Sequence, residues 1–120
     1  MNYNTVWMKI IGGSIMVIFK NCVTNDDLLD KLEQDRVVIL DVRETTEHAH
    51  GHIPGSVLIP LGQLEERYEE LDKESEIYVI CQAGARSNAA CRILEGKGFP
   101  SVYNVLPGMV AWTGPTNSIL

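Results

Sequence analysis

The chain has 120 residues, enough to bury well over half of its unfolded surface in one domain without a disulfide or a structural metal. Its formal net charge of −6 argues against nucleic acid or an anionic membrane surface as a partner. Its three cysteines, Cys22, Cys81 and Cys91, are an odd number without paired spacing, so we expect the reducing cytoplasm rather than a disulfide framework.

Residues 1–20 are strongly apolar on both sides of Gly12 and Gly13. A Gly-Gly pair between two strand-like runs is typical of a β-hairpin. A secretory signal is the alternative, because residues 10–19 have the length of a signal core, but no A-x-A cleavage site follows them. The run is also too short and too interrupted by glycine to span a bilayer. We therefore expect a hairpin extension over residues 1–20 and one domain over residues 21–120.

Beyond residue 20, short apolar runs alternate with amphipathic stretches. Thr24 and Asp27 have the spacing of a helix capping box. In chain order we expect a helix over residues 24–34, a strand over 37–40, a helical turn over 44–49, a strand over 57–59, a helix over 63–71, a strand over 77–80, a helix from about Ser87 that Gly96 and Gly98 end, a strand over 102–105, and a helical turn over 108–112. This alternation predicts an α/β domain with a central, mostly parallel β-sheet flanked by helices.

Cys81 directly follows the apolar run of residues 77–80, whose β-branched residues predict a buried parallel strand. After Ser87, alanines and aliphatic residues recur at helical spacing. Cys81 is therefore expected where a strand ends and a loop leads into a helix. In open α/β sheets, ligands bind at that end of the strands.

The loop after Cys81 has the residue types that suit an anionic sulfur. Gly84 and its small neighbours let the backbone curl, so that N–H groups from Gln82 to Ser87 can point at one spot. The helix N-terminus adds partial positive charge there, and Arg86 adds a full charge. Lowering the pKa of a thiol from about 8.5 to about 6.5 makes it mostly thiolate at neutral pH. We interpret Cys81 as a nucleophile rather than a core cysteine.

Three stretches of the sequence together resemble a single-domain rhodanese, a sulfurtransferase domain. The resemblance runs from about Cys22 to Thr113. The first signature of the family is similar to DVRE at 41–44, followed by GHIPGS at 51–56 and IP at 59–60. Its active-site loop resembles CQAGARS at 81–87. Its closing Gly-Gly…Trp element resembles GMVAW at 108–112. Pro107 stands where that closing element usually has its first glycine.

The resemblance implies a rhodanese-like fold and sulfur transfer by double displacement. The Cys81 thiolate would take sulfur from a small sulfur-containing anion such as thiosulfate, or from a persulfide donor, and hold it as a persulfide. A thiol or cyanide acceptor would then remove it, and a sulfur-relay protein is a further candidate partner. The substrate-binding residues would be Gln82, Ala83, Gly84, Ala85, Arg86 and Ser87. This chemistry needs no metal or organic cofactor, but it requires a thiol that is open to solvent and N–H groups that point at it.

Two features of the loop bear on the substrate. Arg86 can hold the oxygens of a sulfonate by a charge-assisted fork. Gln82 stands where many members that use thiosulfate carry a basic residue, which favours a persulfide donor over thiosulfate. Two other functions remain as alternatives to sulfur transfer. One is a cysteine phosphatase or arsenate reductase, although the four residues between Cys81 and Arg86 form a shorter ring than the five-residue ring of those enzymes. The other is a rhodanese-like module that binds a partner without catalysis.

Asp41 and Arg43 follow a neighbouring strand, and we interpret them as structural support for the loop, as the family resemblance implies. The alternative is a surface ion pair worth less than about 1 kcal/mol. We interpret Glu47 as a solvated residue rather than a catalytic one, and Trp112 as a core residue beside the loop.

The alternation of His48, His50 and His52 raises a metal site as a hypothesis. We predict no metal, because the family motif already accounts for His52 and the sequence shows no second cluster of ligands. Cys91 falls within the helix after the loop and is expected in the core. Cys22 is interpreted as a bystander, with a resolving cysteine as the alternative.

Overall fold

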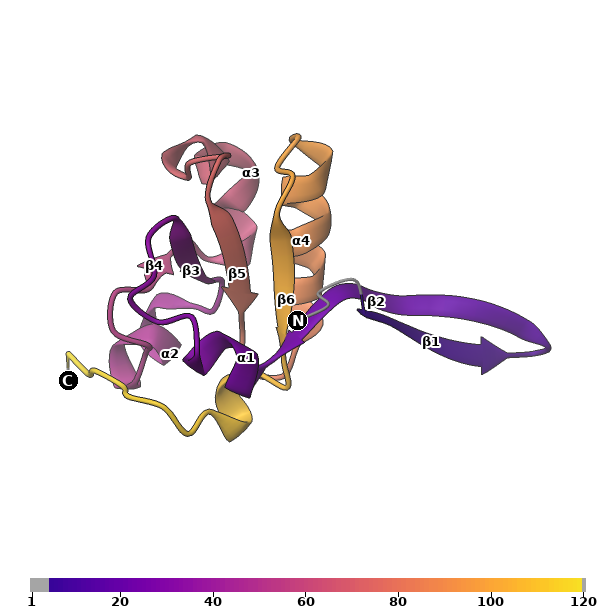
Figure 1. Ribbon diagram of the computed structural model, residues 1–120, viewed down its shortest axis with the longest axis horizontal. Helices are drawn as coiled ribbons and strands as arrows, with labels where there is room; N and C mark the ends of the chain where they lie inside the picture. The colour runs from indigo at the N-terminus through magenta and orange to yellow at the C-terminus, as the bar shows by residue number, and fades with distance from the viewer. Residues whose placement is uncertain (1–4, 120) are drawn as a thin grey trace.

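The fold is built on one mixed β-sheet, which a computed structural model describes for the backbone of residues 5–119 and for the side chains of residues 12–13 and 21–119 (Figure 1). Within that range the strand order is β1-β2-β6-β5-β3-β4, and every neighbouring pair is parallel except β1 and β2. The strands are β1 Thr5–Ile11, β2 Ser14–Thr24, β3 Val37–Asp41, β4 Val57–Leu58, β5 Glu76–Ile80 and β6 Val102–Leu106. The predicted α/β fold with a mostly parallel sheet is confirmed.

The predicted N-terminal hairpin is also present. β1 and β2 pair antiparallel around Gly12 and Gly13, both at positive φ (57° and 81°), as a two-residue hairpin turn of the primed type requires. The hairpin projects away from the rest of the sheet (Figure 1). β2 joins the parallel sheet through Cys22 to Thr24 alone, which pair with Asn104 to Leu106 of β6. One long strand therefore connects the hairpin to the domain.

The helices lie close to their predicted places, but their bounds differ. They are α1 Asn25–Leu29, α2 Thr45–His50, η1 Leu61–Gln63, α3 Leu64–Arg67, η2 Tyr68–Glu70, α4 Ala85–Gly96 and η3 Met109–Ala111. The Thr24–Asp27 capping box forms with both hydrogen bonds at 3.0 Å. The helix predicted over residues 24–34 ends at Leu29, because the chain turns there toward β3 with Glu33 and Arg36 at positive φ. Among the described residues, no helix has the length and apolar character needed to cross a membrane.

β5 is buried on both faces, which explains its unbroken apolar run. Ile77 and Val79 pack into the cluster that includes α3 and α4 residues, while Tyr78 and Ile80 pack into the cluster on the opposite face. A strand covered on both sides needs apolar residues at every position. β5 lies between β3 and β6, so Cys81 emerges among the ends of three parallel strands.

Candidate functional site

Cys81 leaves the carboxyl end of β5, and three residues later Gly84 forms the N-cap of α4. Gly84 has φ 98°, in the region that favours glycine, and a Cβ there would lie 2.5 Å from Leu106 Cδ2. α4 starts at Ala85, two residues before the predicted start near Ser87. This places Ser87 in the first turn of the helix, where a backbone N–H has no acceptor within the helix.

The free N–H groups of this turn point at the sulfur. The Gly84 and Ser87 N–H groups donate to Cys81 Sγ at 3.1 and 3.3 Å, and Sγ lies 3.3 Å from Ser87 Oγ. Burial acts to raise the pKa of the Cys81 thiol, but hydrogen bonds from the Ser87 side chain and from the backbone of Ser87, Gly84 and Ala83 outweigh it. The pKa of Cys81 therefore lies below that of an ordinary cysteine.

The other two cysteines provide an internal comparison. Cys22, Cys81 and Cys91 are 4%, 1% and 2% exposed, so all three are buried. Burial raises the pKa of Cys22 to about 11 and raises that of Cys91 well above the ordinary range. Cys91 packs in the core, as predicted. Cys81 differs from the other two in having hydrogen-bond donors around its sulfur, and not in its burial.

The expectation of a solvent-open thiol is wrong for this conformation, because Cys81 is only 1% exposed. The sulfur lies at the bottom of the loop, and the side chains of Gln82, Ala83 and Ala85 are exposed around it. The sequence motif specifies the order of the loop residues but not how closely the loop closes over the thiol.

The carbonyl groups of the loop are held from the opposite side by the segment that follows β6. Met109 N–H donates to Cys81 O at 2.9 Å, and Val110 N–H donates to Gln82 O at 3.0 Å. Gly108 permits this approach: its φ is 110°, and a Cβ there would lie 2.6 Å from Cys81 O. The Asn25 side chain bonds both the N–H and the C=O of Gly108, at 3.0 and 2.9 Å. With these carbonyls facing η3, the N–H groups can face the sulfur.

Asn104 of β6 is a second support that the sequence analysis missed. It is fully buried, and Ser87 Oγ donates to its Oδ1 at 2.5 Å while its Nδ2 donates to Gly84 O at 3.3 Å. Because a hydroxyl has one proton, Ser87 can donate to a thiolate only by turning away from Asn104. The backbone N–H groups have no such competing acceptor. A polar residue inside an apolar strand run was the available signal, because a buried amide must find partners.

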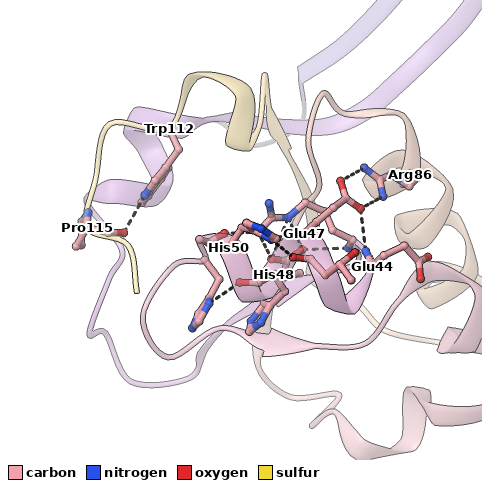
Figure 2. Close-up of polar contacts among 12 residues, drawn as sticks. Glu44, Glu47, His48, His50, Arg86, Trp112 and Pro115 are labelled. Atoms are coloured by element: carbon pink, nitrogen blue, oxygen red, sulfur yellow. Dashed lines mark hydrogen bonds and ion pairs between the residues drawn. The ribbon is translucent and has the colours of Figure 1, made fainter. Parts of the chain in front are cut away.

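Arg86 is paired with Glu47 of α2 across the loop (Figure 2). Nη1 and Nη2 donate to the two carboxylate oxygens at 2.6 and 3.0 Å, and both side chains are about one-third exposed (34% and 33%). The hydrogen bond with Arg86, opposed in part by burial, lowers the pKa of Glu47 to about 2. Glu47, interpreted from the sequence as solvated rather than catalytic, is one-third exposed and forms an ion pair with Arg86 that the sequence did not indicate.

Asp41 and Arg43 form a buried ion pair, not the surface pair considered as an alternative. They are 1% and 4% exposed, and Arg43 Nη2 and Nε donate to the Asp41 carboxylate at 2.8 and 3.1 Å. Arg43 Nη2 also donates to Gly51 O at 2.7 Å, at the end of α2. The pair therefore links β3 to the helix that carries Glu47.

The three histidines do not converge on one point. The rings of His48 and His52 stack with centroids 3.8 Å apart, and His52 Nδ1 lies 2.8 Å from His48 O. His50 Nδ1 instead lies 2.8 Å from Thr46 O. In the described part of the chain, no three side chains of metal-binding type gather. Trp112 is only partly buried at the edge of the core, where its Nε1 donates to Pro115 O at 3.0 Å (Figure 2).

A comparison with known protein families identifies the family to which this arrangement of residues belongs. Residues 24–115, most of the chain, match the family described as the Rhodanese-like domain. The chain belongs to the rhodanese-like domain family. The rhodanese resemblance drawn from the three sequence stretches is confirmed.

Known proteins similar to this chain agree with this assignment. The Bacillus subtilis (strain 168) protein named "Putative sulfur carrier protein YrkF" is 48% identical over 98 residues, which are 82% of this chain and 49% of YrkF, so the chain spans about half of that relative. "Putative sulfurtransferase YtwF" of the same organism is 44% identical over 90 residues, 74% of this chain and 86% of YtwF. The crystal structure of the Alr3790 protein from Anabaena sp. has a TM-score of 0.76 and 31% identity, covering 82% of each chain. These names support a rhodanese-type sulfurtransferase family.

Proposed function

We propose that this rhodanese domain is a sulfurtransferase that carries a sulfane sulfur on Cys81, as a persulfide, between a donor and a thiophilic acceptor. The observation that supports this most is the contrast among three buried cysteines. Cys81 alone among them has N–H donors directed at its sulfur and a lowered pKa. A cysteine that only filled the core would have neither feature.

Loading proceeds by attack of the Cys81 thiolate on the outer sulfur of the donor. The Sγ–S bond forms while the bond from that sulfur to the rest of the donor breaks, and the leaving group departs with the electron pair. With thiosulfate the leaving group is sulfite, and with a persulfide R–S–SH it is the thiolate RS⁻. An acceptor thiolate or cyanide then attacks the outer sulfur, and Cys81 leaves as a thiolate.

The outer sulfur needs donors of its own, about 2 Å beyond Sγ. Ala85 and Arg86 are the first two residues of α4, so their N–H groups have no carbonyl of that helix to bind. In this proposal they bind the negative charge on the outer sulfur, beside the positive end of the helix dipole. Asp41 and Arg43 act as supports, through the position of α2.

The burial of Cys81 favours one competing function, a module that binds a partner without catalysis, because in the proposed transfer a donor can reach Sγ only after the loop over the thiol opens. The same burial argues against a phosphatase, because Sγ itself occupies the N–H donors of Gly84 and Ser87, and Arg86 is engaged by Glu47. A ring filled in this way has less room for a tetrahedral phosphate.

Intact mass spectrometry separates transfer from binding. After incubation with thiosulfate or a persulfide donor, the protein is expected to gain the mass of one sulfur atom, and a peptide map should place it on Cys81. Treatment with cyanide should remove that mass. A protein that gains no sulfur from either donor would contradict the proposal and favour the binding module.

The pH dependence of thiol reactivity tests the lowered pKa of Cys81. Because its hydrogen bonds favour the thiolate, alkylation of Cys81 by a small uncharged reagent should reach half of its limiting rate at a lower pH than alkylation of a free cysteine measured in parallel. The rate should rise with pH through that midpoint and then level off. Rates measured by mass at Cys81 between pH 5 and 10 check this, and a midpoint above that of the free cysteine would show that burial prevails.

A further inference from the structure

The single arginine of the active-site loop is not free to act as an anion clamp. The edge of its guanidinium that carries Nη1 and Nη2 faces both carboxylate oxygens of Glu47, at 2.6 and 3.0 Å (Figure 2). This fork is the geometry in which arginine would hold a sulfonate. A sulfonate must therefore displace Glu47 from Arg86 or use the remaining N–H groups.

No other cation of the described loop substitutes for it. Gln82, next to the nucleophile, is neutral and exposed. Arg43 lies near α2 but is buried and bound to Asp41 and to Gly51 O. The rim of the site thus combines a neutralised ion pair with the exposed Gln82 and small apolar side chains, in a chain of net charge −6.

We propose that Glu47 is a specificity-determining residue: by holding Arg86, it directs Cys81 toward thiol persulfides as donors and away from thiosulfate. This inference rests on the proposed sulfurtransferase function. Thiosulfate approaches as a dianion and leaves sulfite, also a dianion, so its binding and departure both need positive charge at the rim. A persulfide of a neutral thiol carries at most one negative charge, as R–S–S⁻, and the protonated form R–S–SH that is attacked is neutral, so it needs less positive charge at the rim than thiosulfate does. Its reaction forms the Sγ–S bond, breaks the S–S bond of the donor and releases one thiolate RS⁻.

Glu47→Gln tests the inference with little change in shape. Glu47 Oε1 also accepts from Glu44 N–H at 3.0 Å in the capping box of α2, and a glutamine can keep that bond. The variant removes one negative charge and releases the Arg86 fork. We expect kcat/KM for thiosulfate to rise by roughly three- to tenfold, the scale of one partly screened charge–charge contact, while kcat/KM for the persulfide of 2-mercaptoethanol stays within about twofold.

The matched control is Glu70→Gln. Glu70 pairs with Arg67 at 2.7 Å on the surface of η2, so this variant also removes one carboxylate from an arginine, but away from the loop. It should leave the ratio of the two kcat/KM values unchanged. If Glu47→Gln melts well below the parent, Glu47→Asp serves instead. This variant keeps the negative charge but shortens the side chain that contacts Arg86. It should raise the ratio of kcat/KM for thiosulfate to kcat/KM for the persulfide to a smaller extent.

A double variant tests whether Glu47 acts through Arg86. In an Arg86→Met background, the gain in thiosulfate use from Glu47→Gln should shrink to less than about twofold. An equal gain in both backgrounds would overturn the holding role, as would an unchanged donor ratio in Glu47→Gln or a parent that prefers thiosulfate. If the parent is loaded by the persulfide but the donor ratio is unchanged in Glu47→Gln, this inference alone is contradicted. If neither donor loads the protein, both the sulfurtransferase proposal and this inference are contradicted.

Discussion

Cys81→Ser is expected to stop sulfur loading and to lower the rate of sulfur transfer by on the order of 10³-fold or more. A serine hydroxyl at this position can accept the same N–H groups, but it is a far weaker nucleophile at neutral pH and cannot hold a persulfide. The fold should survive, since the exchange changes one buried atom. Turnover with a persulfide donor, together with intact mass before and after loading, measures both effects.

Cys91→Ala is the matched control for this variant. Cys91 is equally buried, at 2% exposure, and lies in α4, but its thiol packs in the core with a raised pKa. Its loss should leave sulfur loading intact while lowering stability slightly. Loading that persisted in Cys81→Ser, or disappeared in Cys91→Ala, would contradict the assignment of the nucleophile.

The position of the nucleophile could be predicted because its signals are local. An unbroken apolar run, a cysteine, a glycine and a helical pattern follow one another within about twenty residues, and each reports on the backbone next to it. The start of α4 was still misplaced by two residues. Its N-cap is Gly84, which makes no side-chain capping bond, so the start lacks the residue type that usually marks it.

The contacts that complete the site could not be predicted in this way, because they join distant segments. Arg86 and Glu47 are 39 residues apart, and Asn25 and Gly108 are 83 apart. The chain has 16 acidic residues, and nothing in the sequence singles out Glu47 as the partner of Arg86. The degree of closure over Cys81 depends on the whole set of contacts around the loop. The motif therefore indicates the chemistry, whereas the tertiary contacts determine access and local charge.

Asp41→Ala is expected to destabilise the domain by about 3–5 kcal/mol, because it leaves the Arg43 guanidinium buried without its carboxylate. Arg43 is 4% exposed and would retain only its 2.7 Å bond to Gly51 O among the contacts described above. For a domain of this size the melting temperature should fall by on the order of 10–20 °C. Urea unfolding followed by circular dichroism measures the change in free energy directly.

The comparison with Glu70→Ala makes this result specific to burial. Glu70 also binds an arginine, Arg67 at 2.7 Å, but on the surface, so its removal should change stability little. Equal losses in the two variants would mean that the Asp41–Arg43 pair contributes no more than a surface pair.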